Sequence, residues 1–183
     1  KVHDKMGGAI QTFVCGGAKL DEEVARDFQT LGFEVLEGYG MTETSPMITF
    51  TRPGRIRVGS PGEVFPGMEV KFVDGEILTR GPNLMKGYYN KEAETKEAVV
   101  DGWLHTGDLG HLDEDGFLFV TGRKKELIVL SNGKNITPAE VENKIMAVDD
   151  VTEEVGVYME KDQLYAVIYP NEVKVKNKEI ADI

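Results

Sequence analysis

The sequence of 183 residues has one cysteine, Cys15, and no excess of positive charge. A single cysteine excludes an internal disulfide and a cysteine-rich zinc site, so we expect a reducing compartment and predict a cytoplasmic location. No apolar run is long enough to span a bilayer, which leaves only contact with a membrane surface open. The 21 basic and 32 acidic residues give a formal charge of −11, and this argues against a nucleic-acid partner.

The sequence also lacks common local signatures of phosphate and metal binding. It contains no G-x-x-x-x-G-K-[ST] loop, and His3, His105 and His111 are not spaced as a metal-binding triad. No targeting signal is visible at the N-terminus, where KVHDKMGGAIQ is typical of the middle of a protein. A nucleotide site would therefore have to be built from other patterns.

The first part of the chain has the pattern of a β-α-β unit. The apolar run Ala9–Cys15 predicts a buried strand, and Phe33–Leu36 predicts a second one. Between them, Asp21–Leu31 has apolar residues at helical spacing, acidic residues in its first turn and Gly32 after its last. Two strands joined by a helix favour a parallel sheet.

The middle of the chain favours short antiparallel strands. Glycine and proline divide it into the strand-like runs Met47–Phe50, Met68–Val73 and Glu76–Thr79. The dipeptide Asp74-Gly75 is typical of a tight hairpin turn. We therefore expect a small antiparallel sheet or a distorted barrel here.

The second half of the chain leads into a small α+β domain. Asn90 is the expected cap of an exposed helix, and Pro138 falls at the first position of a later helix. Before the first of these helices, Tyr88 and Tyr89 are expected to pack. The elements predicted here are a helix over 90–99, a hairpin of strands 109–112 and 117–121 around the turn 113–116, a strand over 126–130, a helix over 137–147, and strands over 154–158 and 164–169.

Two polar clusters, HTGD and GRKK, each follow an apolar segment and each contain a glycine. The aspartate of the first, Asp108, would accept hydrogen bonds from both hydroxyls of one diol if it is fixed at a strand end. The arginine of the second, Arg123, offers planar donors to the same sugar or to a phosphate. Together they point to ribose, although each cluster alone also fits an ordinary turn or a solvated basic patch.

A third cluster follows the second predicted strand and has the letters GYGMTE. Gly38 and Gly40 would let the backbone approach a flat ligand, and Tyr39 can stack on a base. Thr42 and Glu43 offer a hydroxyl and a carboxylate to phosphate and its metal. Without the neighbouring residues, Tyr39 would be better explained as a core aromatic residue and Glu43 as a surface charge.

Together, these clusters resemble the motifs of one enzyme family. WLHTGDLG, DGFLFVTGRKKELI and NITPAEVE are similar to the ribose-binding and hinge motifs of the adenylate-forming acyl-CoA synthetase superfamily, and GYGMTE is similar to its adenine-stacking and magnesium-binding motif. The segment Gly16-Gly17-Ala18 matches the G-G-A loop of that family. The run IVLSNGKN most resembles long-chain fatty acid-CoA ligases.

The resemblance implies a fold of class α/β plus α+β. Residues 1–123 would be the C-terminal part of a large, sheet-containing N-terminal domain with a small antiparallel β-barrel part. Residues 124–126, with Lys125 at the pivot, would be a hinge, and 127–183 an incomplete small α+β C-terminal domain. A Ser/Thr/Gly-rich phosphate loop and a lysine in a P-x-T-x-x-G-K context are not found in the sequence, and we expect them upstream and downstream of it.

For the complete enzyme, the resemblance implies that a carboxylate attacks the α-phosphate of ATP to form acyl-AMP and pyrophosphate. The thiol of coenzyme A would then displace AMP. Catalysis would rest on alignment and on neutralising phosphate charge with Mg²⁺. The implied cofactor-binding residues are Gly16, Gly17, Ala18, Gly38, Tyr39, Gly40, Thr42, Asp108 and Arg123, with Thr42 and Glu43 as catalytic residues and Glu43 as the metal ligand.

Two alternatives stay open at this point. An amino-acid or aryl-acid adenylation domain, or an acyl-carrier-protein ligase, would share Asp108, Arg123 and the GYGMTE cluster. The chain could also be a non-catalytic nucleotide-binding or interaction fragment, because the phosphate loop and the P-x-T-x-x-G-K lysine are both missing from it. We expect a fatty acid as the substrate of the complete enzyme and an inactive fragment, and we make no prediction of oligomeric state.

Overall fold

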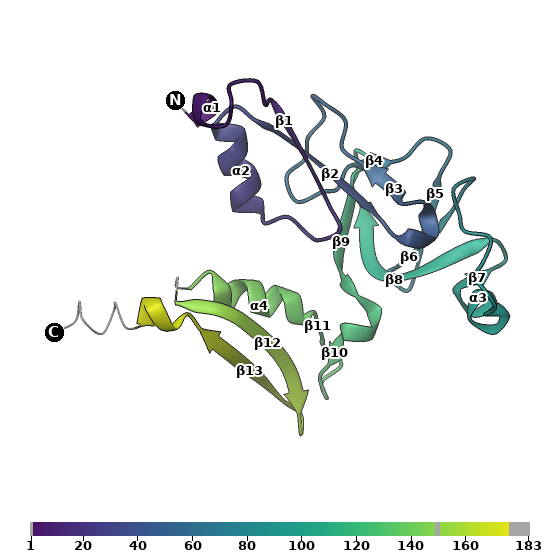
Figure 1. The fold of residues 1–183 in the computed structure, drawn as a ribbon. Coiled ribbons are helices and arrows are strands. Elements are labelled where there is room, and N and C mark those ends of the chain that lie inside the picture. The colour runs from purple at the N-terminus through teal and green to yellow at the C-terminus, as the bar shows by residue number, and fades with distance from the viewer. Residues whose placement is uncertain (1, 149–150, 176–183) are drawn as a thin grey trace. The chain divides into compact units, whose positions relative to one another are not determined.

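The computed structural model describes residues 2–148 and 151–175, which divide into two units between Thr121 and Gly122 (Figure 1). The division lies close to the expected hinge over 124–126, and the domain limits and the hinge stay predictions. Among the described residues, no helix combines the length and the apolar character needed to cross a membrane.

The first unit contains the two larger sheets. Its strands are short and are separated by turns rich in glycine and proline, as the sequence predicts. In chain order its elements are α1 (Val2–Lys5), β1 (Thr12–Gly16), α2 (Glu22–Thr30), β2 (Glu34–Gly40), the 3-10 helix η1 (Thr42–Thr44), β3 (Met47–Phe50), β4 (Glu63–Val64), β5 (Glu69–Val73), β6 (Glu76–Arg80), α3 (Glu92–Ala98), β7 (Val99–Val100) and β8 (Trp103–Leu112), while β9 (Leu118–Arg123) runs across the boundary.

The predicted β-α-β unit is confirmed. Strands β1 and β2 pair in parallel, with Gly16 opposite Gly38, and helix α2 connects them. Asp21 caps the helix, because its carboxylate accepts hydrogen bonds from the amides of Glu23 at 2.8 Å and Val24 at 3.1 Å. Strands β3 and β4 extend this sheet in the antiparallel sense.

Aromatic side chains form the apolar layer between α2 and its sheet. Phe13 lies edge-on to Phe28 and Phe33, with ring centroids 5.2 and 5.3 Å apart. His3 stacks on Phe33 with centroids 4.0 Å apart, and its Nε2 lies 2.7 Å from the carbonyl oxygen of Leu31. The N-terminal histidine therefore packs against this core and closes the end of α2.

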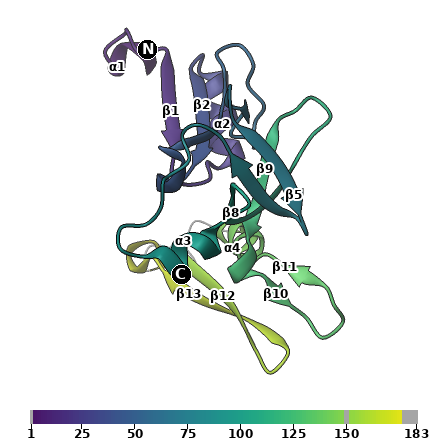
Figure 2. The same cartoon turned by 90° about the vertical axis from the view of Figure 1, so that its right-hand side faces the viewer.

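The second sheet has the strand order β5-β6-β8-β7, with β9 paired to β8, and its strands curve strongly in the view of Figure 2. The paired strands β5-β6, β6-β8 and β7-β8 are antiparallel, which confirms the expected small antiparallel sheet. Asp74 and Gly75 turn the β5-β6 hairpin with φ angles of 51° and 80°, so the predicted tight turn is also confirmed.

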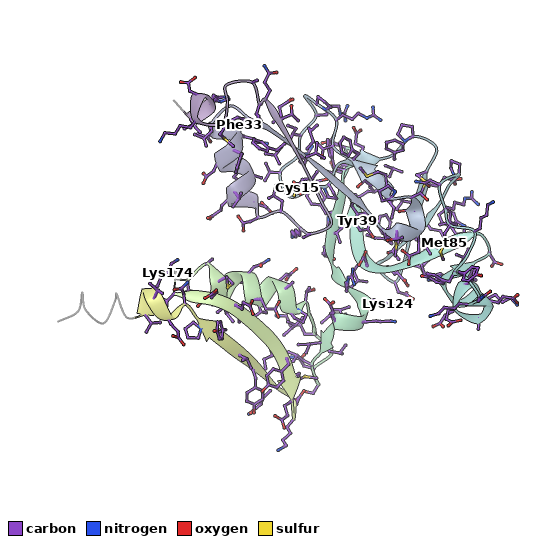
Figure 3. The ribbon with its side chains drawn as sticks, in the orientation of Figure 1. Cys15, Phe33, Tyr39, Met85, Lys124 and Lys174 are labelled. Carbon is purple, nitrogen blue, oxygen red and sulfur yellow. The ribbon has the colours of Figure 1, made fainter. Side chains whose placement is uncertain are left out.

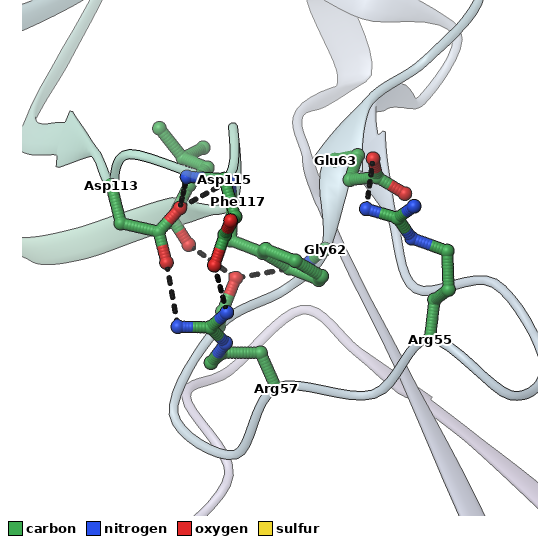
Figure 4. A network of polar contacts seen from close by, with 9 residues as sticks. Arg55, Arg57, Gly62, Glu63, Asp113, Asp115 and Phe117 are labelled. Carbon is green, nitrogen blue, oxygen red and sulfur yellow. Dashed lines mark hydrogen bonds and ion pairs between the residues drawn. The ribbon is translucent and has the colours of Figure 1, made fainter.

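A network of ion pairs joins the loop before β4 to the turn between β8 and β9 (Figure 4). Arg57 pairs through Nη1 with Asp113 Oδ2 at 3.0 Å and through Nη2 with Asp115, and its guanidinium carbon lies 4.8 Å from the ring centroid of Phe117. Asp113 Oδ1 accepts the amide hydrogens of Asp115 and Phe117. These contacts close the predicted 113–116 turn and attach it to the first sheet.

The second unit contains the predicted helix and strand pair. Thr137 is the N-cap of its helix and Pro138 the first helical residue, although the Thr137 side chain makes no capping hydrogen bond. Among its described residues none is fully buried. Its elements are the 3-10 helix η2 (Lys124–Glu126), β10 (Ile128–Val129), β11 (Asn135–Ile136), α4 (Pro138–Met146), β12 (Thr152–Glu160) and β13 (Gln163–Pro170).

Two local predictions are wrong. Helix α3 begins at Glu92 with Lys91 as its N-cap, while Asn90 has a φ of 54° and belongs to the preceding turn. The strand expected over 126–130 is limited to β10 (Ile128–Val129), which pairs with β11, because the chain first makes the single turn η2. In both places a turn conformation displaces the regular element that composition favours.

Candidate functional site

The HTGD cluster lies inside β8 and not at a strand end as predicted. Leu78 of β6 faces His105, but Glu76 faces Leu109, so three residues of β8 run opposite Ile77 alone. Gly107, within this bulge, has a φ of 73°, a left-handed conformation that glycine adopts without strain. The irregular backbone therefore sits in the middle of a paired strand.

Side chains of β6 and β8 hold the bulge. Thr106 Oγ1 donates to the carbonyl oxygen of Ile77 at 2.7 Å and accepts the amide hydrogen of Asp108 at 3.1 Å. The carboxylate of Glu76 accepts the amide hydrogen of Gly107 at 3.2 Å. The backbone on both sides of the glycine is thus bound to side chains as well as to the sheet.

Tyr39 and Asp108 come from clusters that are far apart in the sequence, and the structure brings them together. The Tyr39 hydroxyl donates to Asp108 Oδ2 at 2.7 Å. Asp108 is only 8% exposed, whereas Tyr39, labelled in Figure 3 on β2, is half-buried. The GYGMTE and HTGD clusters therefore meet at one place in the first unit.

The glycines beside Tyr39 make close contacts with the chain itself. A Cβ atom on Gly40 would lie 1.7 Å from the carbonyl oxygen of Pro46, and one on Gly38 would lie 3.1 Å from atoms of Met47 and Phe50. From the sequence, these glycines are expected to let the backbone approach a flat ligand. In the structure, Gly38 lets β2 lie close to side chains of β3 and Gly40 lets it pass Pro46 just before β3, and a ligand-binding role stays a prediction.

We expect Gly40→Ala to lower the free energy of unfolding of the first unit by about 3 kcal/mol or more, because backbone atoms must move to admit the methyl group. Urea denaturation followed by the fluorescence of Trp103 would measure this change. Gly16→Ala is the matched control in the same sheet, since its added Cβ would meet only Gly38 O, at 3.4 Å. Equal stability of the two variants would contradict the steric argument.

Thr42 and Glu43 lie in the single turn η1 directly after β2. The Tyr88 hydroxyl donates to Glu43 Oε1 at 2.7 Å, and this bond, with partial burial, raises the pKa of Tyr88 to about 12. The amide of Met85, labelled in Figure 3, donates to the carbonyl oxygen of Glu43 at 2.7 Å. The loop that contains Tyr88 is therefore tied to the turn that contains the proposed metal ligand.

The packing role expected for the tyrosine pair is corrected by these contacts. Tyr88 makes a specific hydrogen bond to Glu43. Tyr89 is 91% exposed and packs against little. No local pattern distinguishes the two tyrosines, because only the tertiary path of the loop decides which of them faces Glu43.

The donors near η1 suit one kind of metal site. Among the described residues, no group of three or more His, Cys, Asp and Glu side chains gathers as a metal cage. Mg²⁺ usually takes one or two protein carboxylates and completes its shell with water and substrate phosphates. Glu43, with the exposed hydroxyl of Thr42 beside it, fits a magnesium ion that is shared with a bound nucleotide.

The G-G-A segment follows the end of β1. Because β1 and β2 are parallel and Gly16 pairs with Gly38, the segment begins beside the start of GYGMTE. Gly17 has a φ of 88°, so the chain turns sharply there. Two of the sequence motifs thus share one edge of the sheet, as expected for the carboxyl ends of parallel strands.

Comparison with known proteins was made by sequence and by structure. A protein-family model described as AMP-binding enzyme matches residues 1–89. The long-chain-fatty-acid-CoA ligase FadD15 of Mycobacterium bovis is 41% identical over 148 residues, which cover 80% of this chain and 25% of that protein. Residues 1–89 of the chain therefore match the AMP-binding enzyme family.

Further AMP-binding enzymes are similar over most of the chain. A 2-succinylbenzoate-CoA ligase of Bacillus cereus is 35% identical, with 95% of this chain and 38% of that protein covered. The O-succinylbenzoate coenzyme A synthetase of Bacillus subtilis in complex with AMP has a TM-score of 0.79 and 34% identity, over 90% of this chain and 37% of that one. The same enzyme in complex with ATP and magnesium ion has a TM-score of 0.76 and 36% identity, and the match covers 88% of this chain and 36% of that one.

The chain spans about a quarter of the length of the mycobacterial fatty-acid-CoA ligases that it matches. The structural similarity confirms the predicted fold class, a sheet-rich mixture of α and β elements, while the assignment of its parts to a large and a small domain stays a prediction. Arg123 is the last residue of β9, and Lys125 lies in η2. Both belong to the second unit, so the joint ribose site of Asp108 and Arg123 stays a prediction.

The sequence did not predict two residues that contact the candidate site. Tyr88 contacts Glu43, and Glu76 contacts the amide of Gly107. The sequence contains one signal for Glu76, since a carboxylate stands directly before two apolar residues at the head of the predicted strand EILT. A charged side chain that is buried in a strand requires a partner, and here the partners lie on β8.

Proposed function

We propose that the chain is part of an AMP-forming acid-thiol ligase, which activates a carboxylic acid with ATP and transfers the acyl group to coenzyme A. The observation that carries the proposal is the hydrogen bond between the Tyr39 hydroxyl and Asp108, 2.7 Å long. It brings an aromatic ring suited to a base and a carboxylate suited to a diol into contact. A nucleoside has a base and a diol at a similarly short separation.

Each site residue has a proposed role toward the nucleotide. The ring of Tyr39 stacks on adenine, and Asp108 accepts the ribose hydroxyls. A carboxylate has about four acceptor positions, so Asp108 can accept both hydroxyls and still hold Tyr39. Arg123 would add donors to the ribose from the second unit, and the loop of Gly16, Gly17 and Ala18 would border the acyl-adenylate.

The phosphates would lie at η1. Glu43 would hold Mg²⁺ and Thr42 would donate to a phosphate oxygen. Bound Mg²⁺ supplies neutralisation of the charge on the phosphate groups. Met85 binds the backbone of Glu43 and Tyr88 binds one oxygen of its carboxylate, so the neighbouring loop would restrain this residue before the nucleotide binds.

Two displacements follow from this placement. An oxygen of the substrate carboxylate bonds to the α-phosphorus of ATP, and the bond to pyrophosphate breaks. The sulfur of coenzyme A then bonds to the acyl carbon, the bond between that carbon and the phosphate oxygen breaks, and AMP leaves. Between the steps the second unit would turn about Lys125.

The proposed acid is a fatty acid, because the mycobacterial relatives are named as fatty-acid-CoA ligases. A 2-succinylbenzoate-type aryl acid is the second candidate, since relatives with that name cover up to 95% of the chain. Pyrophosphate release by the complete enzyme with a panel of fatty, aryl and amino acids would decide between them. The same assay with coenzyme A and with an acyl carrier protein would identify the acceptor.

The proposed partners are thus ATP, a carboxylic acid and coenzyme A. The cytoplasmic location and the absence of a nucleic-acid partner stay predictions from composition. Contact with a membrane surface stays open, and a vesicle-binding assay with the complete enzyme would test it.

We expect the 183-residue chain alone to form no measurable acyl-AMP, because its sequence contains neither a phosphate loop nor the P-x-T-x-x-G-K lysine. Pyrophosphate release from ATP and fatty acid measures this directly, with the complete enzyme as the positive control. Steady turnover by the purified chain would show that the residues described here suffice for the first step.

A further inference from the structure

Glu76 is a buried carboxylate with no role assigned to it so far. It stands at the start of β6 and is only 5% exposed. Burial of a carboxylate is unfavourable unless hydrogen bonds replace the lost water. We therefore expect Glu76 to stabilise the groups that it contacts through hydrogen bonds.

Two groups that Glu76 contacts lie on β8 at its bulge. Glu76 Oε1 accepts the amide hydrogen of Gly107 at 3.2 Å, and Oε2 lies 3.4 Å from Nδ1 of His105. On the far side, the amide of Gly110 donates to the carbonyl oxygen of Gly75 at 3.0 Å. The Glu76 carboxylate and the adjacent Gly75 carbonyl thus contact β8 before, within and after its bulge.

The bulge needs such a clamp because its glycine is unconstrained by side-chain packing. A Cβ built on Gly107 would meet nothing within 4 Å, and its φ of 73° is one of many that glycine can adopt. A change of the backbone at Gly107 would turn Asp108, the next residue. The Tyr39 hydroxyl donates to Oδ2 of Asp108, so the direction of this carboxylate depends on that bond and on the backbone that carries it.

We propose that Glu76 is a positioning residue for nucleotide binding: through the Gly107 amide and His105 it holds the β8 bulge so that Asp108 meets both ribose hydroxyls. The inference rests on the proposed function, since it assumes that Asp108 binds ribose. Glu76 touches no substrate and acts through the strand. Its effect is confined to the ribose diol and does not extend to the base or the phosphates.

The test compares ATP with 2′,3′-dideoxy-ATP in the complete enzyme. Hydrogen bonds of two hydroxyls to one carboxylate should make wild-type enzyme bind ATP about 10-fold or more tightly than the dideoxy nucleotide. In Glu76→Met, which keeps the buried volume but removes the acceptor, this ratio should fall to about 3-fold or less. Dissociation constants from isothermal titration, measured without acid or coenzyme A, give the ratio.

Three further variants separate positioning from stability. Glu76→Gln keeps an oxygen for the Gly107 amide and should restore most of the ratio. Glu76→Asp keeps the charge but is one methylene shorter, so it should lower the ratio as Met does. Glu63→Gln changes a half-buried carboxylate that pairs with Arg55 at 3.1 Å in β4 and should leave the ratio unchanged.

The outcomes distinguish this inference from the proposed function. A wild-type enzyme that binds the two nucleotides equally would overturn the ribose role of Asp108, and the positioning role with it. A wild-type preference that persists in Glu76→Asp and Glu76→Met would overturn the positioning role alone. An equal loss of affinity for both nucleotides in these variants would also overturn the positioning role, because such a loss would be a general structural effect that does not depend on the ribose hydroxyls.

Discussion

Replacing Asp108 with alanine in the complete enzyme should weaken ATP binding by about 1.5–3 kcal/mol, or roughly 10- to 150-fold. The variant loses the carboxylate that would accept both ribose hydroxyls, and it leaves the Tyr39 hydroxyl without its partner at 2.7 Å. Adenylate formation should fall with binding, because the α-phosphate is aligned through the nucleoside. Titration with ATP and single-turnover formation of acyl-AMP measure the two effects.

The matched control is Asp27→Ala on the exposed face of α2, which removes the same charge away from the site. It should bind ATP like the wild type. Asp108→Asn would keep the side-chain volume and the contact with Tyr39 while removing the charge, and it should show an intermediate loss. If Asp108→Ala forms adenylate as fast as wild type, then the nucleoside binds elsewhere.

The second large effect is expected at Lys125, where the family motif places the pivot. Lys125 lies in the single turn η2 between β9 and β10. A hinge absorbs a large backbone change at few residues, and proline removes that freedom because it fixes φ and lacks an amide hydrogen. Lys125→Pro should therefore trap one orientation of the second unit, which we expect to be the orientation that forms adenylate.

The expected result is a split between the half-reactions. Acyl-AMP formation should stay within about threefold of wild type, whereas transfer to coenzyme A from supplied acyl-AMP should fall on the order of 100-fold, since misplaced catalytic groups cost this much. Single-turnover assays of each step would measure the split. Lys125→Ala is the control, because it removes the side chain but leaves the backbone free.

Equal loss of both half-reactions in Lys125→Pro would indicate misfolding or a direct catalytic role. Loss of the second step in Lys125→Ala as well would assign the effect to the amino group. A variant that is fully active in both steps would place the pivot at another residue.

The sequence by itself determined the elements whose cause is local. Helical spacing with acidic residues in the first turn predicted α2, and the Asp74-Gly75 dipeptide predicted the β5-β6 turn; both are confirmed. Parallel pairing of β1 and β2 followed from a helix between two apolar runs. These features depend on residues that are near one another in the chain, so periodicity and turn chemistry are sufficient to find them.

Residue types also indicated which side chains form the candidate site. Tyr39 and Asp108 were both chosen from short clusters, and they meet in the structure. The resemblance to one family was visible because those clusters occur in one order. What the clusters could not show was the geometry that relates them, since Tyr39 and Asp108 are 69 residues apart.

Only the tertiary structure decided the β8 bulge and the residues that restrain the site. A bulge arises from the register between two strands, and register depends on the partner strand more than on the bulged one. The contacts of Glu76 with Gly107 and of Tyr88 with Glu43 likewise join separate elements. A buried carboxylate or a tyrosine hydroxyl takes whichever partner the folded chain places within reach, and local sequence does not encode that partner.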